Sequence, residues 1–235
     1  MRTAEQRIAQ IRRPPSLPNW VRLNDRRRDE TAKRITRFVL GKPRHALTKI
    51  YTVIADYVSF GLSKETIFKA VDAIPNKYVR DLGCEIVDAL IPWIESQNIQ
   101  GIQIFHDMVA NFPIGRGMLV PVKPTFVVLD NGQLVPYFVI GWASFPFNDY
   151  QKSLLSSVIY RAILTLEDFA GSDAVVVCVP RISSGIPVRT VRSWRISESA
   201  LLTDVQLREQ FDRFGNALDD AVPVILEELA KRGTL

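Results

Sequence analysis

The apolar run Ala-Val-Val-Val-Cys-Val at positions 174–179 constrains the fold more than any other feature of this chain. A strand with one solvated face alternates apolar and polar side chains, and this run does not alternate, which is typical of a strand buried on both faces. Two further strand-like runs, Thr125–Leu129 and Leu134–Ala143, are separated by Asp-Asn-Gly-Gln, and Asn-Gly is a strong hairpin signal. The sequence therefore predicts a sheet that contains a tight hairpin and a fully buried strand.

Most of the remaining chain has helical periodicity, with apolar residues three and four positions apart. Helices are expected at about residues 25–40, 46–60, 64–73, 77–97, 102–111 and 149–169, and from Thr203 onward with an interruption near Pro223. Pro92 is expected to kink its helix or to mark its last turn. Further strands are expected at Gly117–Val122 and at residues 187–196. Residues 1–24 contain three prolines and are expected to be extended and partly disordered, with Trp20 as an anchor.

Composition and cysteine content narrow the class of protein. The 235 residues are 47% hydrophobic and 23% charged, which fits one large globular domain or one domain with an appendage. The longest apolar stretch, Tyr137–Phe147, is too short to span a bilayer, and the first residues lack the apolar core of a secretory signal. Cys84 and Cys178 are the only cysteines, so neither a disulfide framework nor a zinc site is indicated. We therefore expect a soluble, cytoplasmic protein without membrane contact and without a bound cofactor.

The positive charge is concentrated at one end of the chain. Residues 1–49 hold fourteen lysines and arginines against four acids, a net charge of +10, so the remaining 186 residues carry −5. Such density favours a polyanion, because each cation that neutralises a phosphate releases a counterion. An acidic protein partner, or a solvated helix face with Asp29–Lys33 and Glu30–Arg34 pairs, would also account for it. The candidate nucleic-acid-binding residues of this region are Arg12, Arg13, Arg26, Arg27, Arg28, Lys33, Arg34 and Arg37.

Two further segments carry weaker signals for nucleic acid. The segment from Arg181 to Arg195 interleaves cations with an aromatic residue, which could grip a backbone and stack a base. Its candidates are Arg189, Arg192, Trp194 and Arg195. A strand with one exposed arginine face would explain the same pattern. The helix Lys64–Ala73, capped by Ser63 after a Gly-containing turn, resembles the second helix of a helix-turn-helix, although an ordinary packed hairpin has the same signals.

The order of elements over about residues 78–180 is helix, three strands with a tight hairpin, long helix, buried strand. This order resembles the restriction-endonuclease-like fold of the PD-(D/E)xK nucleases. The resemblance implies a mixed α/β (α+β) sheet fold and a Mg²⁺ site in which carboxylates hold the metal and a lysine helps to position the attacking water. It places Thr125 at the position of the first acid, Gly141 at the second acid and Ala143 at the lysine. All three catalytic positions are therefore empty in this sequence.

Two hypotheses follow from the missing motif. Either this is a degenerate, non-catalytic member of the fold that binds nucleic acid through its basic arm, as a scaffold or accessory factor, or it is a Mg²⁺-dependent nuclease whose acids have moved. The fallback candidates are Glu85, Asp88, Asp130, Asp149 and Lys152. A protein-interaction module with an acidic partner is the third alternative. The expected organisation is a basic arm (1–24), a basic helical region (25–76), a nuclease-like core (77–200) and C-terminal helices (201–235).

Overall fold

A four-stranded mixed sheet lies at the centre of the computed structural model, which describes residues 16–41, 47–97, 108–145 and 147–232 together with positions 6, 8, 9, 12, 14 and 99. The strand order is β3 (Phe126–Asp130), β4 (Gln133–Ile140), β5 (Val175–Cys178), β6 (Arg192–Arg195). β3 and β4 form an antiparallel hairpin, β5 is parallel to β4, and β6 is antiparallel to β5. All four residues of β5 are buried. The predicted hairpin and the predicted buried strand are both confirmed.

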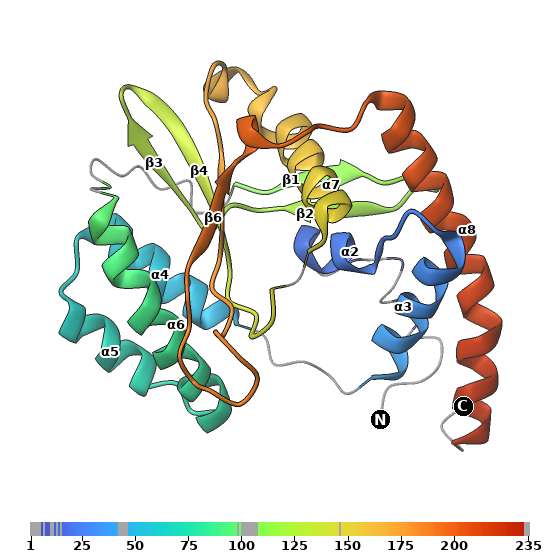
Figure 1. The fold of residues 1–235 in the computed structure, drawn as a ribbon, viewed down its shortest axis with the longest axis horizontal. Helices are drawn as coiled ribbons and strands as arrows, with labels where there is room; N and C mark the ends of the chain where they lie inside the picture. Colours follow the sequence, from blue (N-terminus) through green and yellow to red (C-terminus); the bar gives the residue numbers. More distant parts are fainter. Residues whose placement is uncertain are drawn as a thin grey trace.

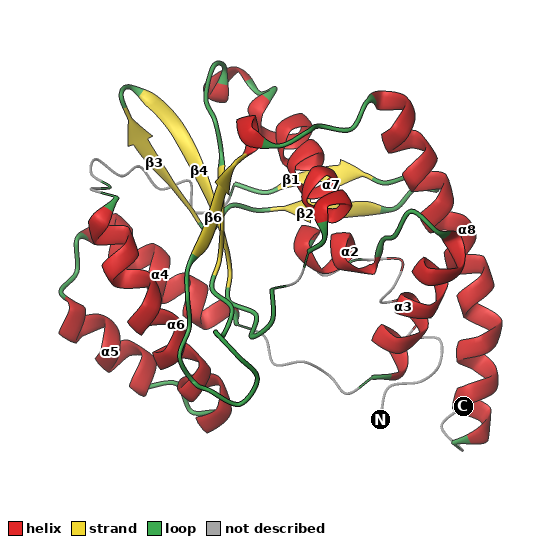
Figure 2. Ribbon diagram, in the orientation of Figure 1, coloured by secondary structure: helices red, strands yellow, loops and turns green. Residues whose placement is uncertain are grey.

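Helices cover both faces of this sheet, as Figures 1 and 2 show. On one face lie α4 (Thr48–Phe60), α5 (Lys64–Asp72) and α6 (Lys77–Ser96), and on the other lies α7 (Asp149–Ile159). Successive residues of a strand point to opposite faces. Val175 and Val177 accordingly pack toward α6, and Val176 and Cys178 pack toward α7. The structure is therefore of the α/β class with a mixed sheet, as expected.

Two hydrophobic cores flank the sheet, the first on the side of α7 and the second on the side of α4, α5 and α6. The first core is completed by helices from both ends of the chain, α2 (Leu17–Leu23), α3 (Arg28–Leu40) and α8 (Asp204–Lys231). A separate hairpin of β1 (Ala110–Pro113) and β2 (Leu119–Val122) also packs on it. The strand expected at 117–122 therefore pairs with β1 and not with β3. It does so because Val120 and Val122 are buried in this core. Asn111, expected in a helix, lies in β1, and residues 102–107 lie outside the described residues.

The N-terminal segment is helical from Leu17, where an extended chain was expected. Pro18 stands at the start of α2, where a missing N–H costs no hydrogen bond, and the Ser16 side chain caps the helix. Trp20 is fully buried and packs against Phe211 and Phe214 of α8. The expectation that Trp20 anchors this segment is confirmed. Burial of Trp20 together with Leu17, Val21 and Leu23 is the physical reason that the segment folds.

Helix ends and the division of the chain also differ from expectation. The helix expected to reach Phe169 is α-helical only to Ile159, after which Tyr160–Leu164 form a π-helical turn. α8 continues through Pro223, which lies on its exposed side, and α6 continues past Pro92 to Ser96.

Residues 25–76 do not form one region: α3 packs with α8 in the first core, whereas α4 and α5 build the second core with α6.

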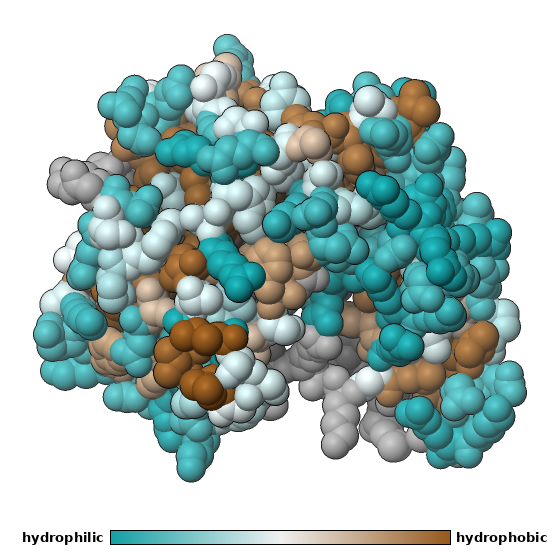
Figure 3. All heavy atoms as spheres, viewed as in Figure 1, coloured by the Kyte–Doolittle hydropathy of each residue, from teal (hydrophilic) through white to brown (hydrophobic). Residues whose placement is uncertain are grey.

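The loop between β5 and β6 forms a second small hairpin, in which Arg181 and Arg189 make an isolated antiparallel bridge. Its tip exposes the aliphatic side chains of Ile182, Ile186 and Val188, which form the hydrophobic patch at the lower left of Figure 3.

Within the described residues, no helix is at once long and apolar enough to cross a membrane.

Candidate nucleic-acid interface

The three expected catalytic positions lie at one end of the central sheet. Each of them makes a hydrogen bond in which at least one partner is a main-chain group. The hydroxyl of Thr125 accepts a hydrogen bond of 2.9 Å from the main-chain N–H of Val139. The N–H of Gly141 donates to the hydroxyl of Tyr51 at 3.1 Å. The carbonyl of Ala143 accepts from the N–H of Arg181 at 2.8 Å. These positions therefore serve the fold at the sheet end where the resemblance implies a metal.

Gly141 is also sterically constrained. A Cβ atom built at this position would lie 2.6 Å from Cδ1 of Ile86, which belongs to α6. Contacts this close do not occur between real carbon atoms without movement of the neighbour. A larger side chain cannot replace Gly141 unless the Ile86 side chain moves, so the packing of Ile86 against this position favours the glycine.

Glu85 of α6 forms an ion cluster with two arginines at the same sheet end. Its carboxylate accepts hydrogen bonds from Arg181 Nε at 2.8 Å and Nη2 at 2.6 Å, and from Arg189 Nε at 3.0 Å. Nη1 of Arg189 donates to the carbonyls of Gly141 and Val179 at 3.1 and 2.7 Å. The Arg189 side chain is 0% exposed and that of Glu85 is 11% exposed. Arg189 was predicted to bind nucleic acid. This is wrong, because its guanidinium is buried and joins α6 to the ends of β4 and β5.

The remaining fallback residues do not gather around Glu85. Asp88 is exposed on α6, Asp130 accepts a hydrogen bond from Asn131 at the far end of β3, and exposed Asp149 begins α7 with Lys152 3.9 Å away. Burial alone would raise the pKa of Glu85, but the two guanidiniums outweigh it and lower that pKa. In the part of the chain that the structure covers, no three His, Cys, Asp or Glu side chains come together as metal ligands would.

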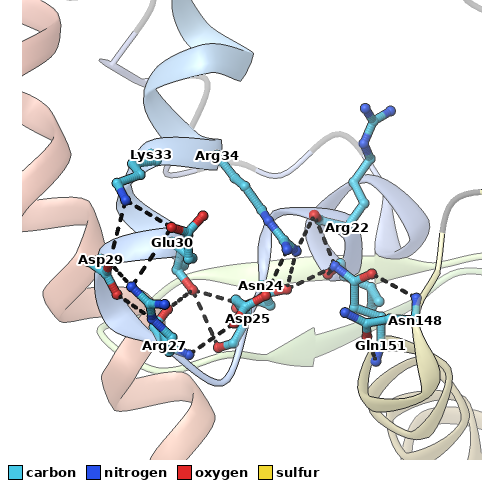
Figure 4. A network of polar contacts seen from close by, with 12 residues as sticks. Arg22, Asn24, Asp25, Arg27, Asp29, Glu30, Lys33, Arg34, Asn148 and Gln151 are labelled. Atoms are coloured by element: carbon cyan, nitrogen blue, oxygen red, sulfur yellow. Dashed lines mark hydrogen bonds and ion pairs between the residues drawn. The ribbon is translucent and has the colours of Figure 1, made fainter.

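Four of the six candidate cations between Arg26 and Arg37 are engaged by acids, as Figure 4 shows in part. Arg27 pairs with Asp29, and Lys33 contacts both Asp29 and Glu30. The hydrogen bond from Arg27 lowers the pKa of Asp29 to about 2. Arg28 binds Asp220 of α8 through two hydrogen bonds of 2.5 and 2.6 Å. The expected Asp29–Lys33 pair is thus present, and these cations are partly neutralised within the protein.

Arg34 holds the turn between α2 and α3. It pairs with Asp25 at 2.7 Å and donates to the carbonyl of Asn24 at 2.9 Å, so the expected Glu30–Arg34 pair is replaced by a longer-range contact (Figure 4). Arg34 therefore has a structural role. Arg12 and Arg37 are exposed, and Arg13 lies outside the described residues.

A second group of cations lies over aromatic rings where the chain leaves β4 and enters α7. Lys152 is 5.3 Å from the ring centre of Phe145 and 5.9 Å from that of Trp194, and Arg192 is 5.3 Å from that of Phe145. Arg22 lies 4.9 Å above the ring of Trp142. Phe147, which is buried, contacts both Trp142 and Trp194 and so joins the two halves. We call this group the cation–aromatic surface; it consists of Arg22, Trp142, Phe145, Lys152, Arg192 and Trp194.

Local structure explains why these residues meet. Asn148 caps α7 and places Lys152 on its first turns, and β6 places Arg192 and Trp194 on the face toward α7. The indole N–H of Trp194 donates to Ser156 Oγ at 3.3 Å, which fixes the ring. Two predicted residues, Arg192 and Trp194, are thus brought together, and Lys152, one of the fallback candidates, lies beside them.

Two other predicted residues, Arg195 and Arg26, lie outside the cation–aromatic surface. Arg195 points the other way from β6 and lies 3.9 Å from Asp173. Arg26 lies 5.2 Å over the ring of Tyr150, close to the cation–aromatic surface along α7. Sequence reasoning missed Arg22, Trp142 and Phe145, because only the fold brings Arg22 to Trp142, 120 positions away, and Phe145 to Arg192, 47 positions away.

No protein-family model matches this chain, and no curated protein is significantly similar to it.

Proposed function

We propose that this protein binds nucleic acid on the cation–aromatic surface and does not cleave it. The observation that carries this proposal is the surroundings of Phe145, whose ring has Lys152 and Arg192 each 5.3 Å away and Trp194 6.5 Å away. A polymer of phosphates and bases can use both kinds of group at once, because cations pair with phosphates and aromatic rings stack on bases. Arg26, which lies over the ring of Tyr150 on α7, adds positive potential beside it.

The absence of cleavage is supported by what occupies the expected catalytic end of the sheet. Mg²⁺ needs oxygen ligands, usually with at least one carboxylate. The carboxylate of Glu85 is already shared by Arg181 and Arg189. The Thr125 hydroxyl accepts a main-chain hydrogen bond, and Gly141 packs against α6. These contacts favour a degenerate, nuclease-like scaffold over a nuclease with relocated acids.

Equilibrium binding to a labelled 20-nucleotide single strand, measured by fluorescence anisotropy, tests the surface. The variant Lys152→Gln/Arg192→Gln should weaken binding by about ten-fold and reduce the log–log salt slope by about 1.4, from about 0.7 per lost phosphate contact. The matched control is Arg28→Gln/Lys33→Gln, which removes the same charge from residues that pair with acids. The control should lower the logarithm of the association constant by less than half of the decrease that Lys152→Gln/Arg192→Gln causes.

Equal losses in the two double variants would show that only net charge matters and would contradict the proposed surface. Polyglutamate of matched charge serves as the competitor that represents an acidic protein. It should bind at least ten-fold more weakly than the oligonucleotide, because it offers no bases to the rings. Equal affinity would favour the acidic-partner alternative.

Cleavage is tested on the same oligonucleotide and on a duplex, with Mg²⁺ or Mn²⁺ added. We expect no product. Metal-dependent product that disappears with Glu85→Ala, Asp88→Ala, Asp130→Ala or Asp149→Ala would identify a relocated site and overturn the non-catalytic half of the proposal. The binding half would stand or fall separately on the anisotropy data.

A further inference from the structure

A small open pocket lies between the C-terminal turn of α6 and the edge strand β6, on the opposite face of the sheet from Lys152. Its volume is 140 Å³. The side chains that give it its chemistry are two aromatic rings and four polar groups: Trp93, Tyr137, Gln97, Ser193, Arg195 and Glu198. Trp194 also lines it, so the pocket adjoins the cation–aromatic surface across a single strand.

The pocket follows from the alternation of β6. Arg192 contacts Phe145 and Trp194 packs on the first core, so both lie on the α7 side of the strand. Ser193 and Arg195 therefore point to the α6 side, where the last turns of α6 carry Trp93 and Gln97. The two faces of one edge strand thus serve two adjoining sites.

The volume of the pocket is sufficient for one planar ring, and the pocket is open to solvent on one side. An engineered cavity of about 150 Å³ in another protein holds a benzene molecule, and 140 Å³ is close to that volume. The half-buried Trp93 offers a ring for stacking, and Tyr137, which is buried and stacked on Phe126 with ring centres 4.9 Å apart, forms a fixed wall. The amide of Gln97, the hydroxyl of Ser193 and the guanidinium of Arg195 offer donors and acceptors to the edge of a polar ring.

On the basis of the proposed function, we propose that this pocket accepts one unstacked pyrimidine base from a single strand that crosses β6. A strand whose phosphates lie against Arg192 and Lys152 reaches the other face of β6 by passing Trp194. A base within a duplex is stacked and paired, and bringing it out costs a few kcal/mol. The protein should therefore prefer single strands to duplexes, and pyrimidines to purines at this one position.

The test uses labelled 20-mers of equal charge: oligothymidine, a fully abasic strand, and abasic strands that carry one central thymine or one central adenine. Oligothymidine should bind about ten-fold more tightly than the abasic strand, as stacking of a base on aromatic rings provides. One thymine should restore several-fold of this difference, and one adenine should restore less.

Ser193→Trp fills the pocket from an exposed strand position, so the variant should fold. It should lower the affinity for oligothymidine by the several-fold that one thymine restores, and leave the abasic affinity unchanged. Ser184→Trp, in the exposed loop before β6, is the control and should bind as the wild type does.

The outcomes separate this inference from the proposed function. An unchanged ratio of oligothymidine to abasic affinity in Ser193→Trp would overturn the base pocket alone. Equal wild-type affinity for oligothymidine and the abasic strand would overturn both the pocket and the stacking part of the proposed function, while leaving phosphate binding intact. Equal restoration by adenine and thymine would overturn the preference for a single ring. Failure to bind any of the four strands would overturn the proposed function itself, and the pocket with it.

Discussion

The side chain of Asn24 accepts a hydrogen bond of 2.6 Å from Nε2 of Gln210, which is 186 residues further along the chain. Both residues are fully buried. Asn24 also donates to the carbonyl of Trp20 at 2.7 Å, and its own carbonyl accepts from Gln151 at 2.9 Å (Figure 4). One polar network inside the first hydrophobic core thus joins the end of α2 to α7 and α8.

Replacement of Asn24 by Ala should lower the free energy of unfolding by about 1–3 kcal/mol, because it leaves buried groups of Trp20 and Gln210 without partners. Urea unfolding followed by circular dichroism measures the change. Asn216→Ala, which removes a hydrogen bond with Arg116 at the surface, is the matched control and should cost less. An equal cost in both variants would mean that the buried network adds nothing beyond an ordinary exposed contact.

Replacement of Trp20 by Ala should cost about 3–5 kcal/mol, because it removes the largest side chain that is fully buried in the first core. Trp20→Phe should cost less than half as much, because the buried indole N–H has no hydrogen-bond partner in the structure to lose. Thermal unfolding midpoints of the two variants check this order. Wild-type stability in Trp20→Ala would contradict the anchoring of the N-terminal segment on α8.

The Glu85 cluster should make stability depend on pH in acid. The folded pKa of Glu85 is below its ordinary value of 4.5, so its contribution is fully present above that value and is lost as pH falls through the folded pKa. Between about pH 5 and pH 3, Glu85→Gln should therefore lose less unfolding free energy than the wild type. Denaturant titrations at several pH values measure the two slopes.

The exposed pair Glu227–Lys231 provides the control for this pH dependence. Glu227→Gln should change the slope less than Glu85→Gln does, because solvent screens an exposed pair. Wild-type and Glu85→Gln slopes that coincide would contradict the role assigned to the cluster.

Gly141→Ala should destabilise the protein by about 1–3 kcal/mol, the usual cost of inserting a methyl group into a packed core. The methyl group would meet Cδ1 of Ile86 at 2.6 Å. Ile86→Val removes that carbon, so the double variant should be more stable than the sum of the two single effects predicts. Strict additivity in a double-mutant cycle would show that α6 does not restrict this position.

Local patterns in the sequence determined the central sheet. The Asn131-Gly132 turn predicted the β3–β4 hairpin because both residues must adopt positive φ, and they do so at 49° and 79°. The unbroken apolar run that contains β5 predicted burial on both faces, because only a strand covered on both sides needs no polar residues. Trp20 was also identified correctly as an anchor. Each of these signals lies within a few residues of the structure that it predicts.

Tertiary structure alone decided which cations are paired with acids inside the protein and which can contact a ligand. Charge in the sequence suggested the basic helical region, yet Arg28 pairs with Asp220 and Arg34 with Asp25. Arg189 and Arg192 are three residues apart and looked equivalent, but one is buried against Glu85 and the other lies over Phe145. The cause is physical: an ion pair or a cation–aromatic contact depends on distances of a few ångströms between elements far apart in the chain, and a sequence pattern does not contain those distances.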